Sequence, residues 1–530
     1  MSITAIHRAG SHDLLVDLAT LDDVLALNSA LDTAPLAGQK DILAAALTVL
    51  IKFDSAAHAV RAASLLPSLE LGAAARNTGK LVEVPVHYDG EDLTAVAELT
   101  GMSVEAVVNA HTSQRWTAAF GGFAPGFAYL RGENQLLNVP RRSTPRTKVP
   151  ALSVALAGEY SAVYPRQSPG GWQLIGHTDV PMWDLSRSTP ALIRPQDTVQ
   201  FTVATQAISV ASPRAEDESP RAASTAPGLQ IINPGLQTLI QDAGRPGYGN
   251  LGVGVAGTAD QASYHQANAL VGNPPGAAAL EVLTGLLSLQ AIGDQVVAVA
   301  GAEVELWITP AENDEVRAPR QAAANAPFAL LDGERLDMTG TGRGLRSYLA
   351  VRGELDVPET LGSRSTDTLS GLGPAALAAG QRLGVTQPHH GHIVGNPQPS
   401  TLPEPDGDGV YTLRVIPGPR ENWFGERGIQ ALSSQLWQVT NESNRVGIRL
   451  ATDGSPLQRS IHEELPSEGV PLGALQVPPS GLPVLFLADH PVTGGYPVIA
   501  TVIEEDLSFA AQLPAGSTIR FSTVESRGTK

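Results

Sequence analysis

The sequence contains no cysteine and few lysines, and each shortage excludes a class of site. Without cysteine the chain has no thiol nucleophile, no disulfide and no thiolate-bound metal. Only 5 of its 35 basic residues are lysines, and aromatic residues make up 5% of the chain. The formal net charge of −18 makes nucleic acid a poor partner. We therefore expect neither thiol chemistry nor a nucleic-acid partner.

Several sequence signatures are also missing. No apolar run reaches membrane-spanning length, and the first residues lack the apolar core of a secretion signal. Gly79-Lys80 precedes leucine, so no P-loop is present, and no G-x-S-x-G elbow with a plausible triad occurs. No methionine adjoins a lysine, so we expect no covalent biotin in this chain. We therefore expect a cytoplasmic protein with no membrane partner. We also expect no metal site, because the histidines of 389–392 lack a nearby acidic partner.

Glycine and proline, in contrast, are abundant. The 53 glycines and 40 prolines imply many turns and favour strands over helical bundles. A chain of 530 residues is too long for one core. We predict a mainly β protein with α+β character, divided into a small N-terminal α/β domain (1–80), a β unit (81–210), a linker (211–227), and two further β subdomains (228–386 and 410–524).

The N-terminal domain shows alternating strand and helix patterns. Apolar strands are predicted at 14–19 and 46–53, and helices at 22–31 and 55–66, the second capped by Ser55. The pattern predicts a small βαβα unit.

The stretch Phe120–Ile175 concentrates glycine, proline and arginine. Its glycines allow unusual backbone angles, and its prolines fix the backbone between them. Arginines on such rigid loops bind carboxylates or phosphates through two parallel hydrogen bonds. The alternative is a barrel with tight corners and a solvated basic edge; we favour the anion site. Its candidate binding residues are Arg141, Arg142, Arg146, Gly170 and Gly171.

A second stretch, 476–499, echoes the first. Both contain Val-Pro, a short apolar strand and then Gly-Gly-aromatic-x-x-Ile, which ends at Ile175 in one and Ile499 in the other. The echo suggests two related β units, one in each half, and adds Gly494 and Gly495 to the candidate binding residues.

Two polar sets in the second half complete the candidates. Asp242 and Arg245 flank a glycine turn; either they pair and fix the turn, or Arg245 holds an anion that Asp242 orients. Arg445 lies in a second set with Asp489 and His490, which end a strand where a carboxylate can act as a base and an imidazole can carry a proton. The alternative for this pair is a turn cap. Asp242, Asp489 and His490 are the candidate catalytic residues, and Arg245 and Arg445 the candidate ligands of substrate or phosphate.

These motifs resemble a known family. The first half resembles the B subunit of bacterial 5-oxoprolinase and the second half resembles its C subunit, so that the chain looks like a natural fusion of the two. The residues that carry the resemblance include Phe123-x-Pro125-Gly126-Phe127, Pro140-Arg141-Arg142, Ser168-Pro169-Gly170-Gly171-Trp172, Gln241-Asp242-x-Gly244-Arg245, Arg445-x-Gly447 and Thr493-Gly494-Gly495-Tyr496-Pro497.

The resemblance implies cyclophilin-like β-barrels and an ATP-dependent hydrolase that opens 5-oxoproline to L-glutamate with a separate A-type partner protein. ATP, with Mg²⁺ as its counter-ion, is the expected cofactor, and self-association of the chain stays open. Two alternatives remain: an allophanate- or urea-type amidolyase or biotin-dependent carboxyltransferase component, and a non-catalytic regulator of a kinase. If the two halves pair as in that family, one cleft is expected to collect Arg141, Arg142, Arg146, Arg245 and Arg445, with Asp489 free for proton transfer.

Overall fold

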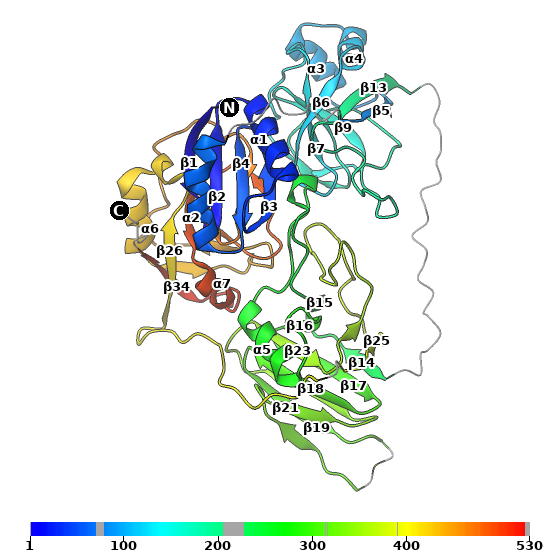
Figure 1. The fold of residues 1–530 in the computed structure, drawn as a ribbon, viewed down its shortest axis with the longest axis vertical. Coiled ribbons are helices and arrows are strands. Elements are labelled where there is room, and N and C mark those ends of the chain that lie inside the picture. The colour runs from blue at the N-terminus through cyan, green and yellow to red at the C-terminus, as the bar shows by residue number, and fades with distance from the viewer. Residues whose placement is uncertain are drawn as a thin grey trace.

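The computed structural model describes residues 2–69, 79–204, 227–312, 314, 316–388 and 391–524, which form four β units (Figure 1). All but the last residue of the predicted linker, and His389 and His390, lie outside the described residues. Strands predominate over helices, and two of the units are barrels, so the expected mainly β architecture is confirmed. None of the helices within the described residues is long and apolar enough to cross a bilayer.

The N-terminal unit is a four-stranded sheet in the order β1-β2-β4-β3, with α1 and α2 packed on one face. The prediction of a βαβα unit is wrong: two strands were missed, and every pairing is antiparallel. The missed strands lie at the sheet edges, where half-buried residues give a weaker apolar pattern than the central strands. The elements are β1 (Ile3–Arg8), β2 (Asp13–Leu18), α1 (Leu21–Thr33), β3 (Gln39–Ala44), β4 (Thr48–Phe53), α2 (Ala56–Leu65) and the 3₁₀ turn η1 (Leu66–Ser68).

The second unit is a seven-stranded barrel in the order β12-β9-β10-β7-β6-β13-β5, with α3 and α4 following its first strand. Its apolar core joins residues from the strands and both helices. A two-stranded ribbon, β8 with β11, projects from it. The elements are β5 (Leu81–Val86), α3 (Leu93–Thr100), α4 (Val104–Thr112), β6 (Trp116–Gly121), β7 (Ala128–Gly132), β8 (Arg146–Val149), β9 (Ser153–Ala157), β10 (Tyr160–Val163), β11 (Ser168–Gly170), β12 (Gln173–His177) and β13 (Thr198–Val203).

The third unit contains two sheets that share one core, and α5 covers β18 and β23 of the second sheet. The first sheet has the order β20-β19-β22-β17-β14-β25-β24, and the second β15-β16-β23-β18-β21. The elements are β14 (Gly228–Asn233), β15 (Thr238–Gln241), η2 (Gly249–Leu251), α5 (Gln261–Val271), β16 (Ala279–Leu283), β17 (Leu287–Ile292), β18 (Gln295–Gly301), β19 (Val304–Thr309), β20 (Arg320–Ala322), β21 (Pro327–Leu330), β22 (Arg335–Gly340), β23 (Arg346–Val351), β24 (Leu355–Asp356) and β25 (Arg382–Val385).

The last unit is a closed barrel in the order β26-β33-β30-β31-β28-β27-β34. It also carries a two-stranded ribbon, β29 with β32. The elements are β26 (Val410–Pro417), η3 (Glu421–Trp423), α6 (Gly425–Ser434), β27 (Trp437–Val439), β28 (Gly447–Ala451), β29 (Glu468–Gly469), β30 (Ala474–Gln476), β31 (Val484–Phe486), β32 (Thr493–Gly494), β33 (Val498–Val502), α7 (Glu504–Ala510) and β34 (Thr518–Thr523).

The two barrels have the same topology. In each, the first strand pairs in parallel with the last, β5 with β13 and β26 with β34, and the remaining strands follow in the same order. In each, a tryptophan that opens the strand after the helices donates its indole N–H to a carbonyl five residues earlier: Trp116 to His111 O at 3.0 Å, and Trp437 to Leu432 O at 2.9 Å. The predicted relation between the two halves is confirmed.

The ribbons of the two barrels carry opposite charges at equivalent positions. In the first ribbon Arg146 lies opposite Gly170, and in the second Glu468 lies opposite Gly494. Arg146 binds Asp92 of its own barrel. Glu468 binds Arg420 of its own barrel, which also binds Asp17 of the N-terminal unit.

The N-terminal sheet packs against the last barrel, far away in sequence (Figure 1). Adjacent strand residues face opposite sides, so Leu14 contacts the helices while Leu15 joins Leu43 and Leu50 of the same sheet and Val492 of the last barrel. The central strands are therefore apolar on both faces. This junction brings the first and second halves of the chain together.

Candidate functional site at the junction of the two halves

Three glycine-rich loops meet where the halves join. The Phe123 N–H donates to Thr493 Oγ1 at 3.1 Å, and the Gly126 N–H donates to Leu251 O at 3.1 Å. Gly252 has φ +77°, and a Cβ there would overlap the carbonyl oxygen of Ala124. The motif-bearing loops of both halves are thus in direct contact.

The N-terminal unit holds the middle loop in place. The carboxylate of Asp41 accepts hydrogen bonds from the backbone of Gly247 and Gly249. The side chain of Asn250 accepts from Ala44 N at 3.1 Å and donates to Asn28 Oδ1 at 3.2 Å. Three parts of the chain therefore position this loop.

A pocket of about 490 Å³ lies at this junction, a volume typical of small-molecule sites. The N-terminal unit, the segment 243–261 and the last barrel all line it. Two of the five lysines in the chain, Lys40 and Lys52, border it, together with Asp13 and His490. The lining thus combines two ammonium groups with the carboxyl groups of Asp13, Asp41, Asp54 and Glu504.

Two carboxyl groups that border the pocket have raised pKa values. Burial raises the pKa of Asp13 to about 6, although Lys52 and His12 oppose the rise. Burial also raises the pKa of Asp41. The charge of Lys52 opposes the rise in the pKa of both groups. A protonatable carboxyl beside an ammonium group is a candidate acid–base and anchoring pair.

His490 lines the pocket, but its ring is buried. The Nδ1–H group donates to Leu487 O at 2.7 Å. Burial, aided by the nearby charge of Lys52, lowers the pKa of His490 to about 4. The imidazole is therefore neutral near pH 7, and its role as a proton carrier stays a prediction.

Asp489 is held by protein groups and is buried. It accepts hydrogen bonds from Arg445 Nε at 3.0 Å and Nη2 at 2.9 Å, and from Thr368 N at 3.0 Å and Oγ1 at 2.6 Å. Arg445 also pairs with the buried Glu281. Burial alone would raise the pKa of Glu281, but Arg445 and Arg346 hold it below the ordinary value. The expected free carboxylate at position 489 is instead part of a buried ion network beside the pocket.

The structure places Asp242 and Arg245 next to this network. Asp242 accepts hydrogen bonds from Ser363 Oγ and Ser365 Oγ, each at 2.6 Å, and from Gly244 N at 2.8 Å. Arg245 is buried and donates to the backbone oxygens of Thr360 and Ser365. Its Nη1 has no hydrogen-bond partner among the described residues. Asp242 therefore fixes its turn through Ser363 and Ser365, and the direct pair with Arg245, one of the two alternatives, is not among its hydrogen bonds.

The arginines of the first barrel belong to a different cluster. Arg142 pairs with Asp92, and Arg146 donates to Asp92 Oδ2 at 2.8 Å and to Glu91 Oε2 at 2.9 Å. Burial alone would raise the pKa of Asp92, but the Arg146 and Leu174 hydrogen bonds hold it below the ordinary value. The exposed Arg141 lies 3.6 Å from Glu464 of the last barrel. The guanidinium groups of these arginines lie against carboxylates of the protein. These contacts do not form the expected single cleft with Arg245 and Arg445.

The predicted glycines shape the two ribbons. A Cβ on Gly170 would overlap the Tyr164 hydroxyl, and one on Gly494 would overlap Gln476 Nε2. Gly171 accepts a hydrogen bond from Arg142 N at 2.8 Å. Gly495 lies beside Leu465 O. Their observed role is close packing, and a role in ligand binding stays a prediction.

Sequence reasoning missed Lys40, Lys52 and Asp13. The available signal was their rarity and place: two of five lysines lie at the ends of neighbouring strands in one small domain. The contacts with 243–261 and 487–490 that complete the pocket join residues hundreds of positions apart, which no local pattern reveals.

Family models match both halves of the chain. Residues 251–523 match the family described as carboxyltransferase domain, subdomain A and B, and residues 4–193 match carboxyltransferase domain, subdomain C and D. A crystal structure of TTHA0988 superimposes with a TM-score of 0.81 at 34% identity, covering 96% of this chain and 99% of that one.

Named relatives match the two halves separately. The chain is 35% identical over 297 residues to the C subunit of 5-oxoprolinase from Escherichia coli (strain K12), covering 54% of this chain and 87% of that protein. It is 43% identical over 132 residues to the B subunit of 5-oxoprolinase from Escherichia coli O157:H7, covering 24% of this chain and 61% of that protein. Urea amidolyase of Lachancea kluyveri is 30% identical over 311 residues, which are 54% of this chain and 16% of that enzyme.

Proposed function

The chain belongs to the carboxyltransferase-domain family, with one half similar to the B component of 5-oxoprolinase and the other similar to the C component, and we propose that it supplies both components of such an ATP-dependent enzyme. In this proposal it opens 5-oxoproline to L-glutamate together with a separate A-type partner protein. The observation that carries the proposal is the pocket that both halves build around Lys40, Lys52 and Asp13.

The chemistry of the substrate suits this pocket. 5-Oxoproline carries one carboxylate, which an ammonium group bordering the pocket can bind; we assign that contact to Lys52. Ring opening must deliver a proton to the lactam nitrogen. A carboxyl with a pKa of about 6 holds a proton often enough near neutral pH to serve as that acid, and we assign this role to Asp13.

The lining does not fit the triphosphate of ATP. Two lysines face four carboxylates, those of Asp13, Asp41, Asp54 and Glu504. A polyanion would meet net negative charge here, and the sequence has no P-loop. We therefore propose that ATP and its Mg²⁺ bind outside this pocket, on the A-type partner or at its interface with this chain.

The test is a coupled ADP-release assay with the A-type partner, comparing 5-oxoproline, urea and allophanate. We expect turnover of 5-oxoproline only with both proteins present. Lys52→Met should lower kcat/KM by about tenfold or more, which corresponds to about 1.4 kcal/mol of transition-state stabilisation. Lys80→Met, at an exposed lysine directly before β5 of the first barrel, is the matched control.

Each contrary outcome points elsewhere. Turnover by this chain without any partner would contradict its assignment as two components of a larger enzyme. Full activity of Lys52→Met would contradict the assignment of this pocket as the substrate site. Loss of activity in both lysine variants would point to a general charge effect.

A urea-type carboxyltransferase component is the second candidate. The family description and the similarity to urea amidolyase favour it, at lower identity than the 5-oxoprolinase relatives. Consumption of urea with a biotinylated carrier, and none of 5-oxoproline, would select this function. Absence of turnover with all three substrates would favour the non-catalytic regulator.

A further inference from the structure

The first barrel is closed by a single β-bridge, next to a backbone hydrogen bond from Asp92 N to Leu174 O at 2.9 Å. Its sheet runs from β12 at one edge to β5 at the other. His87, directly after β5, and His177, at the end of β12, form the one bridge between these edges within the described residues, with N–H···O distances of 2.8 and 2.9 Å. At the equivalent seam of the last barrel, β26 and β33 pair through three residues each. The first barrel therefore has a short seam with a histidine on each side.

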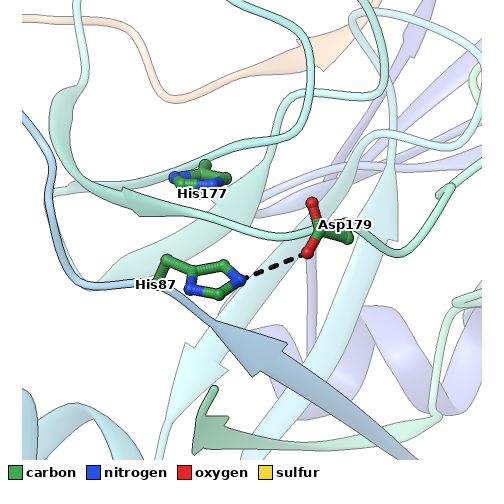
Figure 2. A group of neighbouring side chains, drawn as sticks. All are labelled: His87, His177 and Asp179. Atoms are coloured by element: carbon green, nitrogen blue, oxygen red, sulfur yellow. Dashed lines mark hydrogen bonds and ion pairs between the residues drawn. The ribbon is translucent and has the colours of Figure 1, made fainter. Parts of the chain in front are cut away.

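The side chains at this seam form a repeated pattern. Each edge carries His-x-Asp, as His87-Tyr88-Asp89 and His177-Thr178-Asp179. Each histidine reaches across to the aspartate of the other edge: His87 Nε2 lies 3.2 Å from Asp179 Oδ2, and His177 Nδ1 lies 2.8 Å from Asp89 Oδ1. The two rings stack with centroids 4.8 Å apart and planes at 21° (Figure 2).

Three of these groups can act as ligands to one ion. One ligand atom from each of His87, His177 and Asp179 lies within 4.8 Å of the others. Zinc bonds of about 2.0–2.2 Å to nitrogen and oxygen place ligand atoms about 3.5 Å apart, so the three groups would move closer together on binding an ion. The side chains have room to rotate, since 22% of His87, 44% of His177 and 43% of Asp179 is exposed.

A fourth group has the position of an outer partner. Asp89 is bonded to Nδ1 of His177, which leaves Nε2 of that ring to face an ion. Metal-binding histidines usually have such a partner on the second ring nitrogen, because it fixes the tautomer and the ring orientation. The alternative is two cross-strand His–Asp pairs with no metal.

We propose that His87, His177 and Asp179 bind a divalent transition-metal ion of the zinc type, with Asp89 orienting His177. Two imidazoles and one carboxylate suit Zn²⁺, Co²⁺ or Ni²⁺ better than Mg²⁺ or Ca²⁺. Water completes the coordination, because the site lies at the surface. The ion acts as a clasp: it joins the two edge strands where the backbone provides one bridge.

The test is titration of the chelator-treated full chain with Zn²⁺ in a calorimeter. All proteins carry His389→Gln, His390→Gln and His392→Gln, so that the histidine tract cannot bind the ion. We expect one ion per chain, and a binding constant weakened by at least about tenfold in His87→Gln, His177→Gln and Asp179→Asn. His265→Gln, an exposed histidine of α5, is the matched control.

A second measurement, the melting temperature, tests whether the bound ion stabilises the barrel. Zn²⁺ should raise the melting temperature of the parent protein and not that of His87→Gln, because an ion that binds only the folded barrel stabilises it. Asp89→Asn should weaken binding by about 10- to 100-fold with the stoichiometry unchanged. Circular dichroism at 25 °C checks that each variant is folded. Absence of Zn²⁺ binding to the parent, or equal binding by parent and His87→Gln, overturns the proposal.

Discussion

At the residue scale, the arginines predicted to bind an anion form ion pairs or hydrogen bonds with groups of the protein itself. The lysines Lys40 and Lys52, in contrast, border the pocket. Arg146 binds carboxylates of its own barrel, and Arg445 neutralises Asp489 and Glu281. A guanidinium fork suits a protein carboxylate as well as a substrate carboxylate, so the sequence pattern cannot distinguish the two. The sequence motifs did mark loops that contact one another at the junction of the halves. The charge that faces the pocket depends on which groups remain unpaired after folding.

Asp13 gives the pocket a measurable pH dependence. Its pKa is raised from 3.8 to about 6, so the folded state binds the proton more tightly than the unfolded chain. The stabilisation is complete below about pH 4 and is lost as the pH rises through about 6. At pH 8 the ionised group therefore costs stability. We expect Asp13→Asn to raise the free energy of unfolding by about 1 kcal/mol at pH 8 and to leave it unchanged at pH 4.

Urea denaturation at the two pH values measures this effect. Asp32→Asn, an exposed aspartate of α1, should change stability at neither pH. A destabilised Asp13→Asn protein at pH 8 would mean that the carboxylate of Asp13 is ionised and paired in the folded state.

At the element scale, helices with local end signals were predicted well. The observed α1 and α2 begin and end within two residues of the predicted bounds, and Ser55 caps α2 as expected. The N-caps of α1 and α5 are Thr20 and Asp260, and the side chain of each accepts a hydrogen bond from a backbone N–H of the first turn. Edge strands β1 and β3 were missed, because their pairing partners and not their own residues define them.

The glycine loop between β15 and α5 gives an element-scale prediction. Gly252 and Gly247 both have positive φ, at +77° and +91°, but only Gly252 lies against another loop. Gly247→Ala should cost about 1 kcal/mol of backbone strain. Gly252→Ala adds an overlap with Ala124 O, so we expect a fall in melting temperature at least twice as large.

Hydrogen–deuterium exchange locates the effect. Residues 121–127 should exchange faster in Gly252→Ala and at the parental rate in Gly247→Ala. Equal behaviour of the two variants would show that the overlap is relieved without separating the loops.

At the scale of the whole molecule, the halves are joined through buried charge as well as apolar contact. Arg420 of the last barrel donates to both oxygens of Asp17 at 2.8 Å and pairs with Glu468 at 2.7 Å. The resemblance to a pair of associated proteins predicted that the halves associate. It did not predict which surfaces meet, because Asp17 and Arg420 are 403 positions apart and their contact is set by the tertiary fold.

Cutting the linker should therefore leave the halves together. With a specific protease site placed within 211–227, we expect the cleaved halves to elute as one complex on gel filtration. Arg420→Gln leaves Glu468 buried and unpaired, and should weaken the complex by about 3 kcal/mol, or roughly 100-fold. Arg414→Gln, which loses a pair with Asp506 inside the last barrel, is the control. Separation of the halves without any substitution would contradict a paired architecture.

The opposite charges on the two ribbons bear on how a chain with two copies of one barrel avoids misassembly. Barrels of the same topology can exchange equivalent segments while they fold. If the ribbon of one barrel took the place of the other, Glu468 would face Asp92 and Arg146 would face Arg420. Each exchange would set like charges against each other in a partly buried position, which costs several kcal/mol. The opposite charges of Arg146 and Glu468 thus favour pairing of each ribbon with its own barrel.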